Sequence, residues 1–381
     1  MLLTIFSFLA VLGVLVLVHE LGHFFAARQA GVKVEEFGVG FPPRALGVYR
    51  DPQTKRWVTV GPKRRQAPAT IYSFNWFPLG GFVRIKGEQG EEASDADSFA
   101  HQGIGRRVWI ISAGVTMNVV AAFVLLSIGF AIGLPQVLGD RLPYGAKVVS
   151  TSVQIVEVRA GLPAAEQGLQ IGDTLVSLDG NPVTTLEGVQ AYVDAKVNTP
   201  VTVRVRRGNE VVTKMMTPQL LAETGRGGIG VQLVSTGIVR FPLPVAVWQG
   251  AKSTAGLIVE ILRAFGGILT RLVQRQPVDV ELSGPVGIAV LSGQVVRMGI
   301  RYLLQFTALL SLNLAIINFL PFPALDGGRV LFLMVERFRG RAVSAKLEAI
   351  AHNVGFALLM LLVLFITYRD IYKLVAGAAA P

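Results

Sequence analysis

The hydropathy of the chain alternates between long, mostly uncharged apolar stretches and polar segments. About 20 apolar residues in a helix span the hydrocarbon core of a bilayer. The pattern therefore predicts four transmembrane segments, at residues 1–27, 108–134, 302–335 and 349–368. The third is too long for one straight span, and Pro321 and Pro323 break it, because proline removes a backbone donor and clashes with the preceding helical turn.

The first apolar stretch also resembles a secretory signal peptide, which is absent from a mature protein. The basic residues that begin such a signal are missing before residue 28. A signal peptide also has no use for the sequence His19-Glu20-Leu21-Gly22-His23 near the end of this stretch. We therefore interpret residues 1–27 as a transmembrane segment.

Basic residues set the expected orientation. Residues 28–107 hold 13 Lys or Arg, whereas none precedes residue 28, and a second basic segment follows at 336–348. Cytoplasmic loops carry an excess of Lys and Arg. Both segments are therefore predicted to be cytoplasmic, which places the two termini and the polar region 140–235 outside the cytoplasm.

The cytoplasmic-side region 28–107 contains short strand patterns at 57–60, 69–72 and 81–85, with turn residues between them. The stretch 74–79 is too apolar for a solvated loop, which predicts a small sheet that dips into the bilayer. Irregular backbone at that depth must be buried in protein or line a cavity. A strand edge at Gly81, Phe82 and Val83 is the candidate site for pairing with an extended peptide.

Residues 140–235 form a separate polar domain. Strand-like alternation at 148–158 and 201–205 flanks a short helix, a Gly-Asp turn and an amphipathic helix at 185–197. This order resembles a PDZ domain in the circular permutation common in bacteria. The resemblance makes Gly228, Ile229, Gly230 and Val231 the loop that binds a peptide C-terminus. The alternative is a PDZ fold that serves only as a wall or spacer, because fold does not fix function.

Residues 244–276 carry apolar positions at helical spacing, interrupted by Lys252, Arg263, Arg271 and Arg275. This pattern predicts an amphipathic helix on the outer membrane surface rather than another span.

The composition agrees with a polytopic membrane protein. Of the 381 residues 51% are hydrophobic and only 16% are charged, with a mean hydropathy of +0.52. The net charge of +11 would also suit nucleic-acid binding, but the basic residues lie next to the apolar spans, so we expect a lipid bilayer and no nucleic acid as partner. The chain has no cysteine, so any zinc site must use His, Asp or Glu.

The H-E-x-x-H sequence carries the candidate chemistry. On a helix His19 and His23 share a face and can bind one zinc ion together, and Glu20 lies where it can accept a proton from an attacking water. A chance occurrence in a soluble helix is the competing explanation. It would place three ionisable groups in a membrane-length apolar helix without purpose, which is costly. Asp326 is a second isolated carboxylate, in the third segment, and two His plus one carboxylate form a catalytic zinc set with an open position.

Together these features resemble the bacterial site-2 proteases of the regulator-of-sigma-E type. The resemblance rests on H-E-x-x-H in the first span, a PDZ domain after the second, and N-x-x-P-x-P-x-x-D-G-G from Asn318 to Gly328. It implies four spans around one intramembrane zinc ion per chain, held by His19, His23 and Asp326, with Glu20 as general base. It also implies that Asn313 and Asn318 hold the substrate backbone.

Substrates of the family are single-span segments, such as anti-sigma factors or remnant signal peptides, in the bacterial cytoplasmic membrane. The competing class is a non-catalytic scaffold with a structural zinc. A closed structural site needs four protein ligands, and the sequence offers three. We expect His101 to be a surface residue, His352 an interfacial one, and Asn118 to join helices rather than bind metal.

Overall fold

The computed structural model describes most of the chain and divides into two compact units. Unit 1 comprises Met1–Leu125, Lys252–Gly293 and Phe306–Pro381, and unit 2 comprises Leu126–Ala251 and Gln294–Gln305. The described residues are 2–62, 67–88, 92–139, 142–208, 210–221, 225–276, 284–341 and 343–378. Residues 140 and 141, where the predicted polar domain begins, lie outside them.

Four helices within the described ranges are long and apolar enough to cross a membrane, namely α1 (Leu2–Gln29), α2 (Ile104–Ile132), α7 (Ile300–Phe319) and α9 (Ala345–Ala378). The third predicted segment is divided: α7 ends at Phe319, and α8 (Asp326–Arg339) begins after a six-residue loop. That loop contains Pro321 and Pro323, which explains the division, because neither proline can continue the helix.

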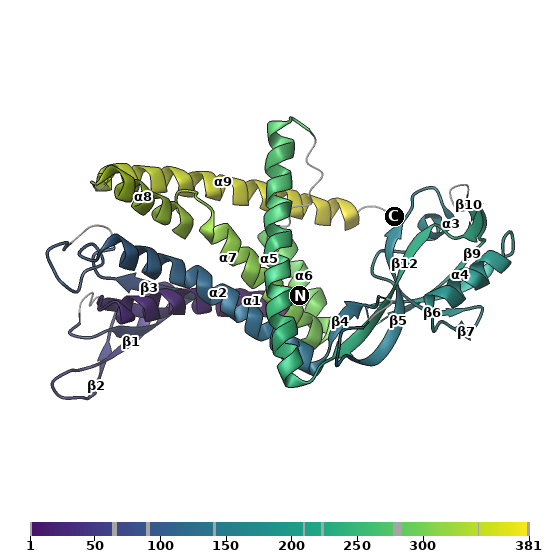
Figure 1. Cartoon of the computed structure of the whole chain (residues 1–381), viewed down its shortest axis with the longest axis horizontal. Helices are drawn as coiled ribbons and strands as arrows, with labels where there is room; N and C mark the ends of the chain where they lie inside the picture. Colours follow the sequence, from purple (N-terminus) through teal and green to yellow (C-terminus); the bar gives the residue numbers. More distant parts are fainter. Residues whose placement is uncertain are drawn as a thin grey trace. The chain divides into compact units, whose positions relative to one another are not determined.

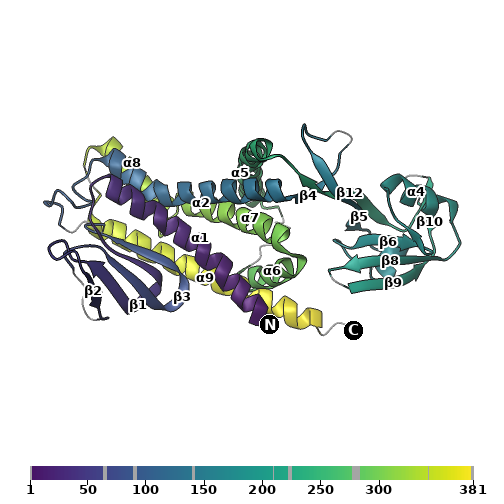
Figure 2. The ribbon, with the colours of Figure 1, turned by 90° about the horizontal axis from the view of Figure 1, so that it is seen from below.

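A small sheet in unit 1 packs against α1, as both views show (Figures 1 and 2). It consists of β1 (Val34–Arg50), β2 (Trp57–Val60) and β3 (Ile71–Ile85), in the order β2-β1-β3. The two halves of β3 pair with opposite edges of the same part of β1, since Phe37 is registered with both Tyr72 and Val83. The stretch from Gly81 to Ile85 is therefore an outer strand of this sheet. The long strand β1 was not predicted, because its glycines and prolines hide the alternation of a strand.

Large apolar side chains are exposed on this sheet. They are Val39, Phe41, Leu46, Trp57, Phe74, Trp76 and Phe77. A solvated sheet rarely exposes so many neighbouring aromatic groups. An apolar surface of this kind marks contact with a protein or a membrane, and the dip into the bilayer stays a prediction.

Unit 2 contains a seven-stranded sheet in the order β4-β12-β5-β6-β8-β9, with β7 paired to β6 (Figure 2). Its strands are β4 (Leu134–Val137), β5 (Lys147–Val158), β6 (Thr174–Leu178), β7 (Asn181–Pro182), β8 (Val201–Arg207), β9 (Glu210–Met216) and β12 (Val231–Arg240). The hairpin β10 (Gln219–Leu221) and β11 (Arg226–Gly228) and the helices α3 (Pro163–Glu166) and α4 (Leu186–Ala195) complete it. Its core is built from alternate strand residues such as Val201, Val203 and Val205.

Two further helices have distinct characters. The helix α5 (Leu243–Val273) exposes apolar side chains such as Trp248, Leu262 and Leu269, and its length and composition do not mark it as a candidate span. The helix α6 (Pro285–Met298) is apolar but shorter. Its first turn is held by Asp370 of α9, whose Oδ2 accepts the N–H groups of Gly284 and Gly287 at 2.9 and 2.8 Å.

Candidate metal centre

The inward face of α1 carries both histidines. Its buried positions include Ser7, Val11, Leu15, His19 and His23, each four residues after the last. Side chains four residues apart lie on one face of a helix, so the two imidazoles share the buried face of α1 with the apolar residues that pack there. His19 and His23 are only 6% and 9% exposed.

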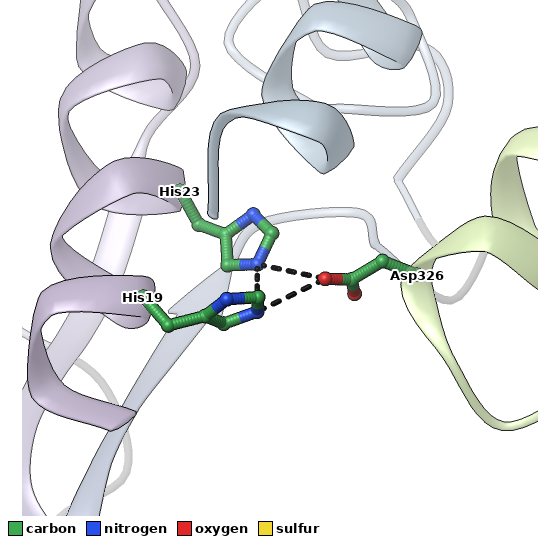
Figure 3. A group of neighbouring side chains, drawn as sticks. All are labelled: His19, His23 and Asp326. Atoms are coloured by element: carbon green, nitrogen blue, oxygen red, sulfur yellow. Dashed lines mark hydrogen bonds and ion pairs between the residues drawn. The ribbon is translucent and has the colours of Figure 1, made fainter. Parts of the chain in front are cut away.

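Asp326 of α8 completes the cluster (Figure 3). Its Oδ2 lies 3.0 Å from His19 Nε2 and 3.5 Å from His23 Nε2, and the two Nε2 atoms are 3.2 Å apart. Tetrahedral zinc bonds of about 2.0–2.1 Å separate ligand atoms by about 3.3 Å. The three atoms therefore stand where three ligands of one zinc ion would stand.

Hydrogen bonds to the other ring nitrogens fix the chemistry of these atoms. His23 Nδ1 lies 2.9 Å from the carbonyl oxygen of Ile110, which can only accept, so Nδ1 carries a proton and, in the neutral ring, Nε2 has a lone pair. Asp326 Oδ2 is buried and accepts no hydrogen bond among the described residues. When both rings are neutral with the proton on Nδ1, three lone pairs converge and repel one another, and a bound cation would relieve this repulsion. The donor set thus fits zinc.

Asn118 of α2 contacts His19 of α1, so it joins two helices as the sequence predicted, although its contact to a candidate zinc ligand was not predicted. Its Nδ2 lies 3.2 Å from His19 Nδ1, while its Oδ1 is buried without a hydrogen-bond partner in the described structure. Rotating the amide by 180° lets Oδ1 accept the proton of His19 Nδ1 and leaves Nε2 for a metal. One signal in the sequence was available: Asn118 follows Gly114 by about one helical turn, so both lie on the same face of α2.

Glycines allow the close helix packing around the cluster. A Cβ on Gly114 would lie 2.4 Å from His23 Nε2 and 2.8 Å from His19 Nε2, and a Cβ on Gly22 would lie 2.3 Å from the carbonyl oxygen of Ala113. Any larger residue at Gly114 would enter the space of the ligands. The helices α1 and α2 can thus approach within backbone contact at the metal centre.

The start of α8 is held by its own glycines and by ion pairs. A Cβ on Gly327 would lie 2.2 Å from the carbonyl oxygen of Phe319, and one on Gly328 would lie 2.3 Å from that of Phe322. The sequence Asp-Gly-Gly therefore lets the α7–α8 loop fold back on the first turn of α8. Ion pairs from Arg107 to Glu336 and from Arg329 to Glu88 hold α8 beside α2 and the segment after β3.

A cavity of about 210 Å³ adjoins the cluster. Its lining includes the three candidate ligands, Glu20, and Phe82 and Val83 of β3. Glu20 Oε2 accepts the backbone N–H of Val83 at 3.1 Å. Gly81 instead packs on α1, where its Cβ would lie 3.1 Å from Leu17 Cδ1.

Other candidate residues lie apart from this cavity. Asn313 and Asn318 are not in its described lining, and Asn313 Nδ2 donates to Leu309 of its own helix at 2.9 Å. His101 is exposed, and its Nδ1 lies 3.2 Å from the carbonyl oxygen of Ala93. His352 Nδ1 accepts the backbone N–H of Ala324 at 2.8 Å, a specific contact that an interfacial histidine does not require.

The predicted peptide loop belongs to unit 2. Ile229 is 3% exposed and part of the core, while Gly230 has a φ of +86° and lies where a Cβ would meet Leu162. Their carbonyl oxygens accept the N–H groups of Ala164 and Arg159, both at 2.9 Å. Gly228 belongs to β11, and Val231 begins β12.

Helices able to cross a membrane and a His-Glu-His-Asp site define the class of membrane-associated metallopeptidases. The chain matches the model of peptidase family M50 over residues 7–362. A provisionally named zinc metalloprotease of Clostridium perfringens is 34% identical to it, covering 96% of this chain and 98% of that one. One of Agrobacterium fabrum is 31% identical, over 97% and 96%, and zinc metalloprotease RasP of Geobacillus kaustophilus is 29% identical, over 97% and 98%. The chain belongs to peptidase family M50 and is a metalloprotease.

Among solved structures, the PDZ domain of an SdrC-like protein from Listeria monocytogenes matches 24% of this chain and 92% of its own. The identity is 23% and the TM-score is 0.20.

Proposed function

We propose that this protein hydrolyses peptide bonds within transmembrane segments of single-span proteins in the bacterial cytoplasmic membrane. The observation that carries this proposal is that Asp326, at the start of α8, meets His19 and His23 beside Glu20 on α1, a helix with the length and composition of a membrane span. One such cluster occurs in the described residues, so we propose one zinc ion per chain. Anti-sigma factors and remnant signal peptides are the substrate classes that the family resemblance favours.

The residues that line the cavity have different proposed roles in the reaction. Zinc, when bound, would polarise the scissile carbonyl and lower the pKa of the attacking water. His19, His23 and Asp326 would hold that ion. Glu20 Oε1 takes the proton from the water and passes it to the leaving amine, while Oε2 stays bonded to Val83 N–H.

The substrate must be extended before it can react, because an intact helix keeps its carbonyl groups in i to i−4 hydrogen bonds. We propose that the outer strand 81–85 pairs with the unwound segment beside Phe82 and Val83, which line the cavity, while the N–H of Val83 stays with Glu20. Asn313 and Asn318 remain candidate contacts to the substrate backbone further along α7.

Unit 2 is proposed to be an extracytoplasmic PDZ domain, together with extracytoplasmic N- and C-termini. The strand β4 pairs with one edge of β12, along residues Thr236 to Val239. The same edge continues at Val231 after the Gly228–Gly230 loop, near α4. A peptide C-terminus can add to such an edge.

A scaffold with a structural zinc is the less favoured function, because it needs a fourth protein ligand and the described residues cluster only three.

Two measurements on the full chain in detergent separate the two functions: zinc content and cleavage of a model single-span substrate. Glu20→Gln should keep its zinc and lose about 100- to 10,000-fold in rate, because a carboxamide cannot act as a base. Glu210→Gln, at an exposed position, is the control. A Glu20→Gln rate within a few-fold of the unchanged protein would refute the assignment.

A further inference from the structure

The loop that presents Asp326 contains a residue in an unusual backbone conformation. Ala324, two residues before Asp326, has a φ of +78°. Residues with a Cβ rarely adopt this left-handed conformation, because the Cβ crowds the backbone carbonyl groups. Such strain persists only where neighbouring structure imposes it.

The helix α9 holds Ala324 in this left-handed conformation through two contacts about one turn apart. His352 Nδ1 accepts the backbone N–H of Ala324 at 2.8 Å. Gly355 follows, where a Cβ would lie 2.5 Å from the carbonyl oxygen of Pro323, so the backbone of α9 touches the loop directly. The ring of His352 also packs on Phe332 of α8, with centroids 5.6 Å apart.

The protonation of His352 follows from this geometry. Because Nδ1 accepts, the neutral ring carries its proton on Nε2, which is buried and lies 3.8 Å from Glu348 Oε1. A side chain that presents one acceptor at the position of Nδ1 can make the same bond. Asparagine does so with Oδ1, whereas leucine fills similar space without an acceptor.

We propose that His352 is a positioning residue for the zinc ligand Asp326, acting through the left-handed conformation of Ala324. The inference rests on the proposed role of Asp326 in binding zinc. When the bond to Ala324 is lost, the loop relaxes toward an ordinary conformation. The carboxylate then turns away from the two imidazoles, whose own supports on α1 and α2 are unchanged.

The test measures zinc affinity of the full chain in detergent by competition with a colorimetric chelator. His352→Leu should weaken zinc binding about three- to tenfold, in line with the net worth of one hydrogen bond. His352→Asn should bind within about twofold of the unchanged protein. Adding Ala324→Gly to His352→Leu should recover most of the loss, because glycine adopts a positive φ without strain.

The outcomes separate this inference from the proposed function. Equal affinities for His352→Leu and the unchanged protein, or for His352→Asn and His352→Leu, would overturn the positioning role. Should Asp326→Ala retain full zinc affinity, the ligand assignment itself would fail. If His352→Leu gives no folded protein, Ala324→Val takes its place: a β-branched residue is strained at this φ, and unchanged zinc affinity would refute the inference.

Discussion

The backbone N–H of Val83 donates a hydrogen bond to Glu20 Oε2 across 3.1 Å. The two residues lie 63 positions apart in the sequence, one on the outer strand of a small sheet and the other within H-E-x-x-H. The bond orients the carboxylate that we assign as the general base. It also shows that this N–H points away from β1, toward the cavity where a substrate must enter.

Val83→Pro should slow cleavage of a helical substrate strongly while zinc content stays normal. Proline removes the N–H that holds Glu20 and disturbs the strand edge proposed to pair with the substrate. Val83→Ala is the matched control and should do much less, because it keeps the backbone donor. Cleavage rate and zinc content are measured for both variants on one substrate. Equal rates would mean that neither the bond to Glu20 nor this edge matters.

Asn118→Ala should weaken zinc binding about 10- to 100-fold, the usual effect of removing a partner from a metal-binding histidine. Asn118→Asp should retain affinity, because a carboxylate oxygen can accept the proton of His19 Nδ1. Thr116→Ala on the same helix is the control, since Thr116 is exposed and its hydroxyl donates to the carbonyl oxygen of Ser112 on its own helix. Chelator competition gives the affinities, and an Asn118→Ala value equal to the control would exclude the proposed contact.

The orientation of the chain can be tested with single cysteines, because the protein has none. Thr184→Cys in unit 2 and Ser94→Cys near the small sheet are both at exposed positions. An impermeant thiol reagent should label Thr184→Cys in intact cells, after opening of any outer membrane, and Ser94→Cys only after lysis. The opposite pattern would reverse the topology.

The stability of unit 2 should depend on the pair Asp173–Arg207. Burial opposes ionisation of Asp173, but two hydrogen bonds from Arg207, at 2.8 and 2.7 Å, and one from Gln170 N–H outweigh it and lower the pKa of the carboxyl. A lowered pKa stabilises the fold above the unfolded-state value of about 3.9, and this contribution is lost as the pH falls through the folded value.

Arg207→Met should therefore destabilise unit 2 at pH 7 by about 1–3 kcal/mol. This is less than the loss expected for a fully buried ion pair, because the Arg207 side chain is 34% exposed and partly screened by solvent. The difference from the unchanged protein should shrink as the pH falls from about 4, near the unfolded-state pKa, through the lowered pKa of folded Asp173. Pulse proteolysis of the full chain in urea measures this difference in stability, with an acid-active protease at low pH. The exposed Arg206→Met is the control, and a loss that does not vary with pH would contradict the role of the charge.

The sequence by itself determined the ligand types and the number of candidate spans. Helical periodicity puts His19 and His23 on one face, uncharged stretches of span length mark the membrane helices, and two prolines divide the third segment. These features are local, because they depend on residues a few positions apart. The partnership of Asp326 with the two histidines was inferred from the isolated ionisable groups in two predicted spans and from the resemblance to a family, not from local spacing.

Only the tertiary structure decided which distant groups meet. Asn118 touches His19 across 99 positions, Val83 touches Glu20 across 63, and His352 touches Ala324 across 28. Each is a hydrogen bond to a partner on another element, and no periodicity along one element encodes it. Such contacts depend on how closely the helices approach, which is set here by glycine backbones at Gly114 and Gly355.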